Sequence, residues 1–273
     1  MSKYNSNRGI YGGVAQGFIT VFTVLFLAIG LIGSGLFVCC APFTTESLST
    51  MFSRWDGSAF TQEELVKAAE VTRDYTVGSH DRNAVYHMLY EINRSSQEAG
   101  RSSAPLAGAP DLFLDSPEPN ADVLAQNFRS ASEMYVLSGE ALDHLDDVFY
   151  VVDTARIALI SLLIFGIVGC IILGKTAGRT RLGHTLVAAA LFVIAIFAVL
   201  AVWVIVDFNG FFAVLHSLFF AEGSWTFDLD SLLIRMYPTN FWIGMGVVWL
   251  ATTVLACLIC SILGLLINGK KKA

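Results

Sequence analysis

Two histidines lie in settings that suit proton-transfer chemistry, and the first is His144. It belongs to a short acidic run, and a helix there would place His144 and Asp147 on one face at the spacing i, i+3. A carboxylate beside an imidazole holds its tautomer and raises its basicity, as a general base or proton shuttle requires. The alternative is a solvated acidic helix end that happens to carry a histidine, and the spacing alone leaves both interpretations open.

The second histidine, His216, lies in an aromatic stretch that begins where a long apolar run ends. Residues 206–228 hold six phenylalanines and one tryptophan around it. The stretch is too aromatic for a solvent loop and too polar to cross a bilayer, which is typical of a segment at the membrane interface. His216 could there reach an ester at headgroup depth, or it could be the polar tip of an aromatic membrane anchor.

The composition indicates an integral membrane protein that has to position these two segments. The chain has 273 residues, of which 55% are hydrophobic and 15% charged, and its mean hydropathy is +0.61. A soluble domain carries about 25% charged residues. The five cysteines lie in or beside apolar runs, so we predict neither a disulfide framework nor a metal or redox site, and we read Cys257 and Cys260 as small apolar helix residues.

The apolar residues form four blocks, each long enough to cross a bilayer as a helix of about 20 residues. The first block is too long for a cleaved signal peptide. We therefore predict an all-α membrane protein with four transmembrane helices, an extracytoplasmic domain between the first and second, and an interfacial segment between the third and fourth. The predicted segments are a cytoplasmic N-terminus (1–13), the first span (14–39), the extracytoplasmic domain (40–153), the second span (154–174), a basic cytoplasmic loop (175–184), the third span (185–206), the interfacial aromatic segment (207–240), the fourth span (241–267) and a basic cytoplasmic tail (268–273).

The outer domain shows one clear helix signal and one long irregular stretch. Thr61 and Glu64 have the spacing of a capping box, and Gly78 suits the end of the helix that follows. Residues 95–125 are rich in Ser, Ala, Gly and Pro, which predicts a flexible excursion. From Ala131 a helical pattern resumes and leads to the first histidine.

The distribution of charge predicts the orientation. The two termini and the 175–184 loop hold eight of the seventeen Lys and Arg residues and no Asp or Glu, whereas all 23 acidic residues lie in 41–153 or 207–230. By the positive-inside rule the termini and the loop are cytoplasmic, and both histidine segments face the outside. The net charge of −6 argues against nucleic acid as a partner.

Two arginines are further candidates for binding an anionic group. Arg156 stands at the start of the second span, where it could pair with Asp153 or bind a lipid phosphate. Arg235 precedes Pro238 and could hold a phosphate or an oxyanion. His80 and His87 are read as surface residues, because a metal site needs three or four ligands in a set geometry.

Taken together, the outer segments resemble a family of bacterial four-helix membrane proteins that includes the lipoprotein intramolecular transacylase. The resemblance rests on His144-Leu-Asp-Asp147-Val at the entrance to the second span and on His216, followed by two phenylalanines and a Trp225-Thr-Phe-Asp turn. Trp55 and the capping-box segment are similar to the family's first outer segment. The resemblance implies that the functional histidines are His144 and His216, with Asp147 as the motif aspartate.

The resemblance also implies a reaction at the outer leaflet, in which one fatty acyl chain moves from a glycerol oxygen to the amine of the same lipoprotein cysteine. We predict that His216 is the base and that His144 assists. An oxyanion donor, worth about 3 kcal/mol in other acyl-transfer sites, could be Arg235, the Trp225 indole or a backbone amide. The residues expected to bind substrate or lipid are Arg235, Trp225, Phe219, Phe220 and Arg156.

On this interpretation the chain is a multi-pass cell-membrane enzyme whose partners are a diacylglyceryl lipoprotein and membrane lipid, and we expect no cofactor. The alternative is a non-enzymatic four-helix membrane protein that binds lipid or a protein partner. Outer loops of the claudin type usually hold a disulfide, and residues 41–150 contain no cysteine. A relative that keeps the fold without the chemistry would differ only in the activity of the two histidine variants.

Overall fold

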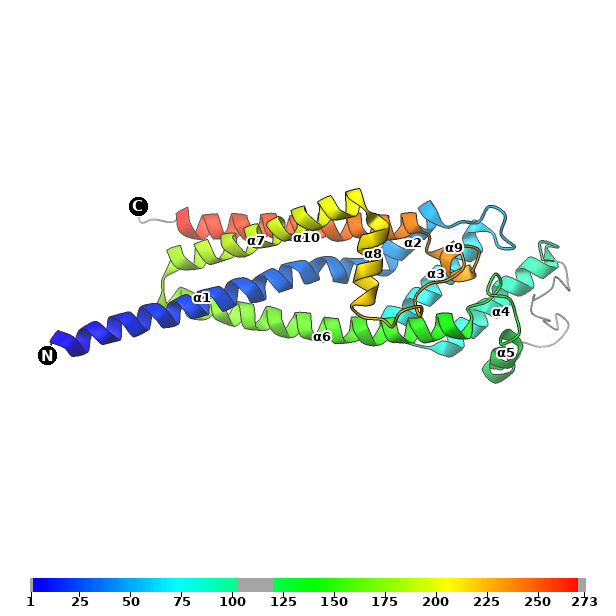
Figure 1. Ribbon diagram of the computed structural model, residues 1–273, viewed down its shortest axis with the longest axis horizontal. Coiled ribbons are helices and arrows are strands. Elements are labelled where there is room, and N and C mark those ends of the chain that lie inside the picture. Colours follow the sequence, from blue (N-terminus) through cyan, green and yellow to red (C-terminus); the bar gives the residue numbers. More distant parts are fainter. Residues whose placement is uncertain (1, 103–119, 270–273) are drawn as a thin grey trace. The chain divides into compact units, whose positions relative to one another are not determined.

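The computed structural model describes residues 2–102 and 120–269, with side chains described from residue 13 onward. Within these ranges the chain is all-α and forms no strand (Figure 1). The helices are α1 (Ser2–Cys39), α2 (Pro42–Phe52), α3 (Gln62–Val77), α4 (Arg82–Glu98), α5 (Ala121–Phe128), α6 (Gly139–Thr176), α7 (Arg179–Val206), α8 (Phe208–Ser217), α9 (Leu232–Met236) and α10 (Thr239–Gly269).

Four of these helices are long and apolar enough to cross a membrane, as predicted. They are the Gly13–Cys39 part of α1 and the whole of α6, α7 and α10. Large apolar side chains on them are left uncovered by the rest of the protein, and Ile205 on α7 is 82% exposed. Such surface is stable only against lipid or a partner, and the chain is a multi-pass membrane protein.

The chain divides into two compact units. The first comprises residues 1–38, 154–208 and 248–273, which are the apolar parts of α1, α6, α7 and α10. Its helices approach closely at small residues, the usual way in which membrane helices pack. A methyl group at Gly35 of α1 would overlap the ring of Trp249 on α10, and one at Gly264 would lie 2.7 Å from the carbonyl oxygen of Gly183 on α7.

The second unit comprises residues 39–153 and 209–247 and has an apolar core of its own. Within it α2 packs on α3, α3 on α4, and α4 on α5, while the short α9 packs on α3. The largest side chains buried in this core come from α3, α4, α5, α9 and the stretches beside them: Phe60, Leu65, Tyr75, Val85, Leu89, Ile92, Leu124, Val136, Leu232, Met236 and Phe241.

The helix signals in the outer domain are partly confirmed. The capping box of Thr61 and Glu64 is formed, and Gly78 ends α3. Two expectations were wrong. The predicted excursion over 95–125 does not begin at 95, because α4 continues to Glu98 and the hydroxyl of its buried Ser96 donates to the carbonyl of Ala59. Much of the remaining stretch lies outside the described residues. The helix predicted from residue 131 begins only at 139, after a series of turns.

Helix α6 is long enough to belong to both units. Its 38 residues span about 57 Å at about 1.5 Å per residue, whereas a bilayer's hydrocarbon core is about 30 Å thick. Its acidic residues all precede residue 154, and the second unit holds that charged first part. The charged first part of α6, which carries His144, therefore belongs to the second unit and not to the apolar one.

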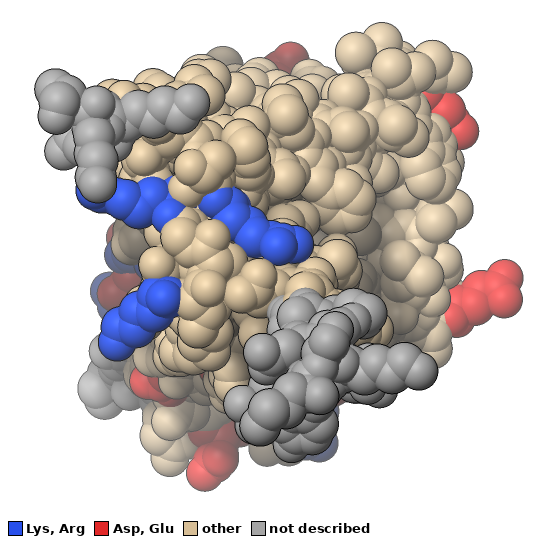
Figure 2. Space-filling model, turned by 90° about the vertical axis from the view of Figure 1, so that its left-hand side faces the viewer, with Lys and Arg blue, Asp and Glu red and all other residues tan. Residues whose placement is uncertain are grey.

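The opposite end of α6 is basic. Lys175 lies in the last turn of α6, and Arg179 and Arg181 lie in the first turn of α7. Figure 2 shows Lys and Arg side chains gathered on the face seen from this end. The connection is tied down by hydrogen bonds from Gln16 Nε2 to the carbonyl of Thr176 at 3.0 Å and from Arg181 Nε to Thr20 Oγ1 at 3.2 Å.

Candidate functional site

The second unit brings the two predicted histidines together. His144 lies on the first part of α6 and His216 in the last turn of α8, and their ring centroids are 6.3 Å apart with an interplanar angle of 27°. The His144 side chain is buried and that of His216 is half-buried. The connection that follows α8 reaches the first part of α6 in Figure 1, and its aromatic residues contact His144 directly.

The position of His216 assigns its tautomer. Its Nδ1 lies 2.9 Å from the backbone carbonyl oxygen of Phe212, one helical turn earlier. A carbonyl oxygen can only accept, so Nδ1 carries the hydrogen and the lone pair of the neutral ring lies on Nε2. Burial lowers the pKa of His216 below its usual value, although the bond to the Phe212 carbonyl opposes this shift. Near neutral pH, His216 therefore presents an unprotonated Nε2.

His144 is a buried and much weaker base. Burial, followed by the neighbouring His216, lowers its pKa to about 4, although the charge of Asp147 opposes the shift. Its Nδ1 is buried without a hydrogen-bond partner. The sequence spacing suggested that Asp147 would hold the His144 tautomer, but Asp147 is exposed and acts on His144 only through its charge. On α6 the spacing i, i+3 places one side chain inward and the other outward.

Aromatic rings surround the histidine pair. Phe220 meets His144 edge-on with centroids 4.7 Å apart, and Phe227 lies 5.7 Å from the same ring. Trp225 lies 5.0 Å from His216, and its indole Nε1 is buried without a hydrogen-bond partner. Phe219 is 55% exposed, and its ring meets that of Phe220 edge-on with centroids 6.3 Å apart. Water is thus partly excluded from the two imidazoles, which is the cause of their lowered pKa values.

Arg235, one of the two predicted arginines, is held by groups of the protein itself. Arg235 is buried, and it donates from Nε to the carbonyl of Asp230, from Nη1 to the carbonyls of Arg54 and Asp56, and from Nη2 to the Asp230 carboxylate, at distances between 3.0 and 3.2 Å. Four of its five N–H groups are thus used within the protein. Arg156 belongs to the first unit, where its side chain is half-buried on α6.

A group of polar side chains that the sequence did not predict holds the turn of α6 that carries His144. The Asp146 carboxylate accepts hydrogen bonds from Tyr75 Oη and Arg82 Nη2, and its Oδ1 lies 3.6 Å from His80 Nε2. The His80 ring is stacked between Tyr75 and Phe149, with centroids 4.5 and 3.9 Å away. We call Tyr75, His80, Arg82 and Asp146 the Asp146 cluster.

The Asp146 cluster gives no local sequence signal, because Asp146 lies 64 or more positions from each of its three partners along the chain. His80, which the sequence predicts to be a surface residue, is half-buried. Its backbone adopts φ of 55°, which is uncommon for a residue other than glycine. Burial and the bond to Asp146 raise the pKa of Tyr75 to about 12, so its hydroxyl stays protonated and continues to donate.

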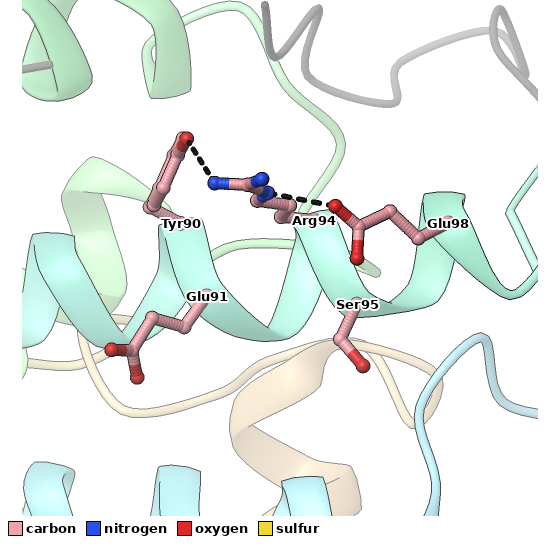
Figure 3. A pocket seen from close by; sticks show the side chains of 5 residues that line it. All are labelled: Tyr90, Glu91, Arg94, Ser95 and Glu98. Carbon is pink, nitrogen blue, oxygen red and sulfur yellow. Dashed lines mark hydrogen bonds and ion pairs between the residues drawn. The ribbon is translucent and has the colours of Figure 1, made fainter. Parts of the chain in front are cut away.

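One surface hollow of the second unit lies on α4 and is not lined by the histidines. It has a volume of about 240 Å³ and is lined by Tyr90, Glu91, Arg94, Ser95 and Glu98 of α4 (Figure 3). Arg94 donates to the Glu98 carboxylate at 2.8 Å and to Tyr90 Oη at 3.4 Å. These pairs satisfy one another on one helix face, and the hollow has the character of a solvated polar surface.

The fold defines an all-helical, multi-pass membrane protein in which two histidines are paired. Comparisons with known proteins show what it is similar to. Residues 118–242 match the family model of the lipoprotein intramolecular transacylase Lit, so the predicted family resemblance is confirmed. The matched range contains both histidines. No curated protein matches the chain.

Solved structures of Lit from Bacillus cereus share the fold. One has 15% sequence identity and a TM-score of 0.60, covering 94% of this chain and 98% of that one. A second, a variant in which a histidine is replaced by arginine, has 16% identity and a TM-score of 0.60, covering 97% of both chains. A third, with the same histidine replaced by alanine, has 16% identity and a TM-score of 0.56, covering 96% of this chain and 98% of that one.

Proposed function

We propose that this chain is a lipoprotein intramolecular transacylase. It moves one fatty acyl chain from the diacylglyceryl group of a lipoprotein to the α-amine of the same cysteine and leaves a lyso-form lipoprotein. The observation that carries the proposal is the histidine pair, which two segments distant in sequence bring within 6.3 Å inside the region that matches the Lit family model.

The reaction is an isomerisation, and the only atoms that the protein has to move are protons. The amine nitrogen attacks the ester carbonyl carbon, and the bond from that carbon to the glycerol oxygen then breaks. One proton leaves the nitrogen and one reaches the glycerol oxygen, so no co-reactant is consumed. Donor and acceptor belong to one molecule, and holding them in contact supplies much of the rate through effective molarity.

His216 is the general base in this proposal. The bond of its Nδ1 to the Phe212 carbonyl leaves Nε2 as the proton acceptor, and the lowered pKa of His216 keeps that atom unprotonated near neutral pH. After the attack, the same imidazolium returns the proton to the leaving glycerol oxygen. His144, with a pKa of about 4, stays neutral throughout and orients the amine through Nδ1, while Asp147 stabilises positive charge that develops nearby.

The proposal includes an orientation and a place for the lipid. Both termini and the basic α6–α7 connection lie on the cytoplasmic side of the cell membrane, and the second unit lies outside. The stretch 207–240 lies in the interface, where its uncovered apolar side chains contact lipid: Val214, Leu215, Leu218, Phe219 and Leu229. Phe219 and Phe220 flank the acyl chain, and Arg156 lies at the depth of a lipid phosphate.

The experiment compares the N-terminal lipopeptide of one lipoprotein from a lipoprotein-making host with and without this chain. Substrate and product are isomers of equal mass, so tandem mass spectrometry must locate the acyl chain on nitrogen or on glycerol. We expect N-acyl lyso-form lipopeptide only with the wild-type chain. His216→Ala and His144→Ala should abolish it, whereas His184→Ala should not, because His184 is exposed on α7 in the first unit.

Two results would contradict parts of this proposal. Unchanged diacyl lipopeptide in the presence of inserted, folded wild-type protein would favour the alternative of a membrane protein that binds lipid or a partner without chemistry. Full activity of the His216→Ala variant would show that His216 is not the base.

A further inference from the structure

The indole nitrogen of Trp225 is a buried donor that the protein leaves unpaired. A buried N–H group without a partner destabilises the folded protein, and such groups are rare enough in native proteins that each needs an explanation. A ligand that supplies an acceptor is one such explanation. The acceptor would sit beside His216, because the two rings are 5.0 Å apart.

The chain holds Trp225 in this place by a tight turn rather than by the indole itself. The turn has a hydrogen bond from the Ser224 amide to the Ala221 carbonyl at 3.2 Å. Gly223 has φ of +84°, a conformation that side chains other than glycine rarely adopt. The Trp225 ring then packs on Phe212, with centroids 6.5 Å apart. The backbone thus positions the ring, and Nε1 stays without a hydrogen-bond partner.

The charged candidate for this task, Arg235, already uses most of its donors within the protein. Arg235 uses four of its N–H groups on carbonyls and a carboxylate of the 54–56 and 230 segments, so its guanidinium supports the scaffold. The indole N–H of Trp225, beside His216, is a donor that no group of the protein accepts from.

We propose that Trp225 Nε1–H donates to the carbonyl oxygen of the ester that is attacked, and that it stabilises the oxyanion of the tetrahedral intermediate. The inference rests on the proposed transacylase function and assigns a catalytic residue to it. When the amine attacks, the carbonyl π electrons move to the oxygen and this hydrogen bond strengthens. When the intermediate collapses, the electrons re-form the carbonyl and the C–O bond to glycerol breaks. Trp225 loses no proton in either step.

The kinetic test uses the full-length protein in vesicles with a synthetic diacylglyceryl-cysteine lipopeptide. Removing one oxyanion donor lowers kcat by about 10²–10³-fold in other acyl-transfer enzymes. We therefore expect Trp225→Phe to lower kcat by about that factor with KM changed only a few-fold. Trp225→His, which keeps an N–H group, should recover part of the loss, and Trp55→Phe should behave as wild type, because Trp55 is 51% exposed.

Stability separates this role from a structural one. Because the indole N–H is unpaired, Trp225→Phe removes no hydrogen bond from the folded protein, and its melting temperature should stay near that of wild type. Full kcat in Trp225→Phe would overturn the inference. A fall in kcat matched by a comparable loss of folded protein would overturn it too, because Trp225 would then be structural.

A binding measurement tests the same contact without turnover. In the His216→Ala background, the indole N–H resonance of Trp225, assigned by its loss in Trp225→Phe, should shift downfield on adding the diacylglyceryl lipopeptide. The dialkyl ether analogue, which lacks the carbonyl, should leave it in place. Equal shifts with both ligands would overturn the inference. A wild-type protein that forms no N-acyl product would instead contradict the transacylase function itself.

Discussion

Replacing Asp146 by asparagine should loosen the turn of α6 that carries His144. The Asp146 carboxylate accepts from Arg82 on α4 and from Tyr75 on α3, and His80 lies beside it. Asparagine has one oxygen acceptor and no charge, so it cannot serve both donors as well. In the proposed mechanism Asp146 acts on catalysis only through His144, two residues earlier, and is a positioning residue.

The expected destabilisation follows from the two hydrogen bonds. A bond to a charged group contributes about 1.5–3 kcal/mol when buried, but the Asp146 and Arg82 side chains are 28% and 40% exposed and solvent screens them. We expect Asp146→Asn to lower the free energy of unfolding by about 2 kcal/mol. The coupling between Asp146→Asn and Arg82→Met in a double-mutant cycle should be about 1 kcal/mol.

Reversible unfolding in mixed micelles measures the free energy, and transacylation of the synthetic lipopeptide measures the effect on the site. The matched control is Asp143→Asn, which makes the same charge change at an exposed position of the same helix. We expect Asp146→Asn to reduce kcat per folded molecule while Asp143→Asn does not. If the two variants had equal stability and equal kcat, the Asp146 cluster would not hold His144, and the reasoning would be wrong.

Two further predictions concern His216 and Arg235. Burial lowers the pKa of His216, so its neutral form persists to lower pH than that of a free imidazole. The acid limb of the kcat–pH profile should therefore have its midpoint below about 6.5. A midpoint above that value would contradict the assignment of His216 as the base. Arg235→Lys should lower the melting temperature, because a lysine cannot reproduce the forked contacts to three backbone carbonyls and a carboxylate. In the protein that remains folded, the KM for the lipopeptide should be unchanged, and a raised KM with normal stability would restore Arg235 as a substrate-binding residue.

Local sequence patterns predicted the helices that depend on local interactions. The four long apolar segments reappear in α1, α6, α7 and α10, because a single segment in hydrocarbon can satisfy its backbone by itself only as a helix. The capping box of Thr61 and Glu64 formed as expected, because both of its bonds lie within three residues. The family resemblance was also carried by short motifs, each readable from a few neighbouring residues.

Contacts between distant segments could not be read in this way. The sequence pointed to Asp147 as the partner of His144, because i, i+3 is a local relationship, but the burial of one side chain and the exposure of the other depend on what packs against α6. Asp146, at a less suggestive spacing, is instead held by Tyr75 and Arg82 from two other helices.

By itself, the sequence determined that this is an all-helical membrane protein with two histidine-bearing segments between its spans, because composition, periodicity and charge act along the chain. Only the tertiary structure decided that the His144 and His216 rings meet, that Trp225 keeps a buried unpaired donor beside them, and that Arg235 is used by the scaffold. The reason is physical: pairing and burial of polar groups are settled by packing between segments, and chains of different local sequence can achieve the same packing.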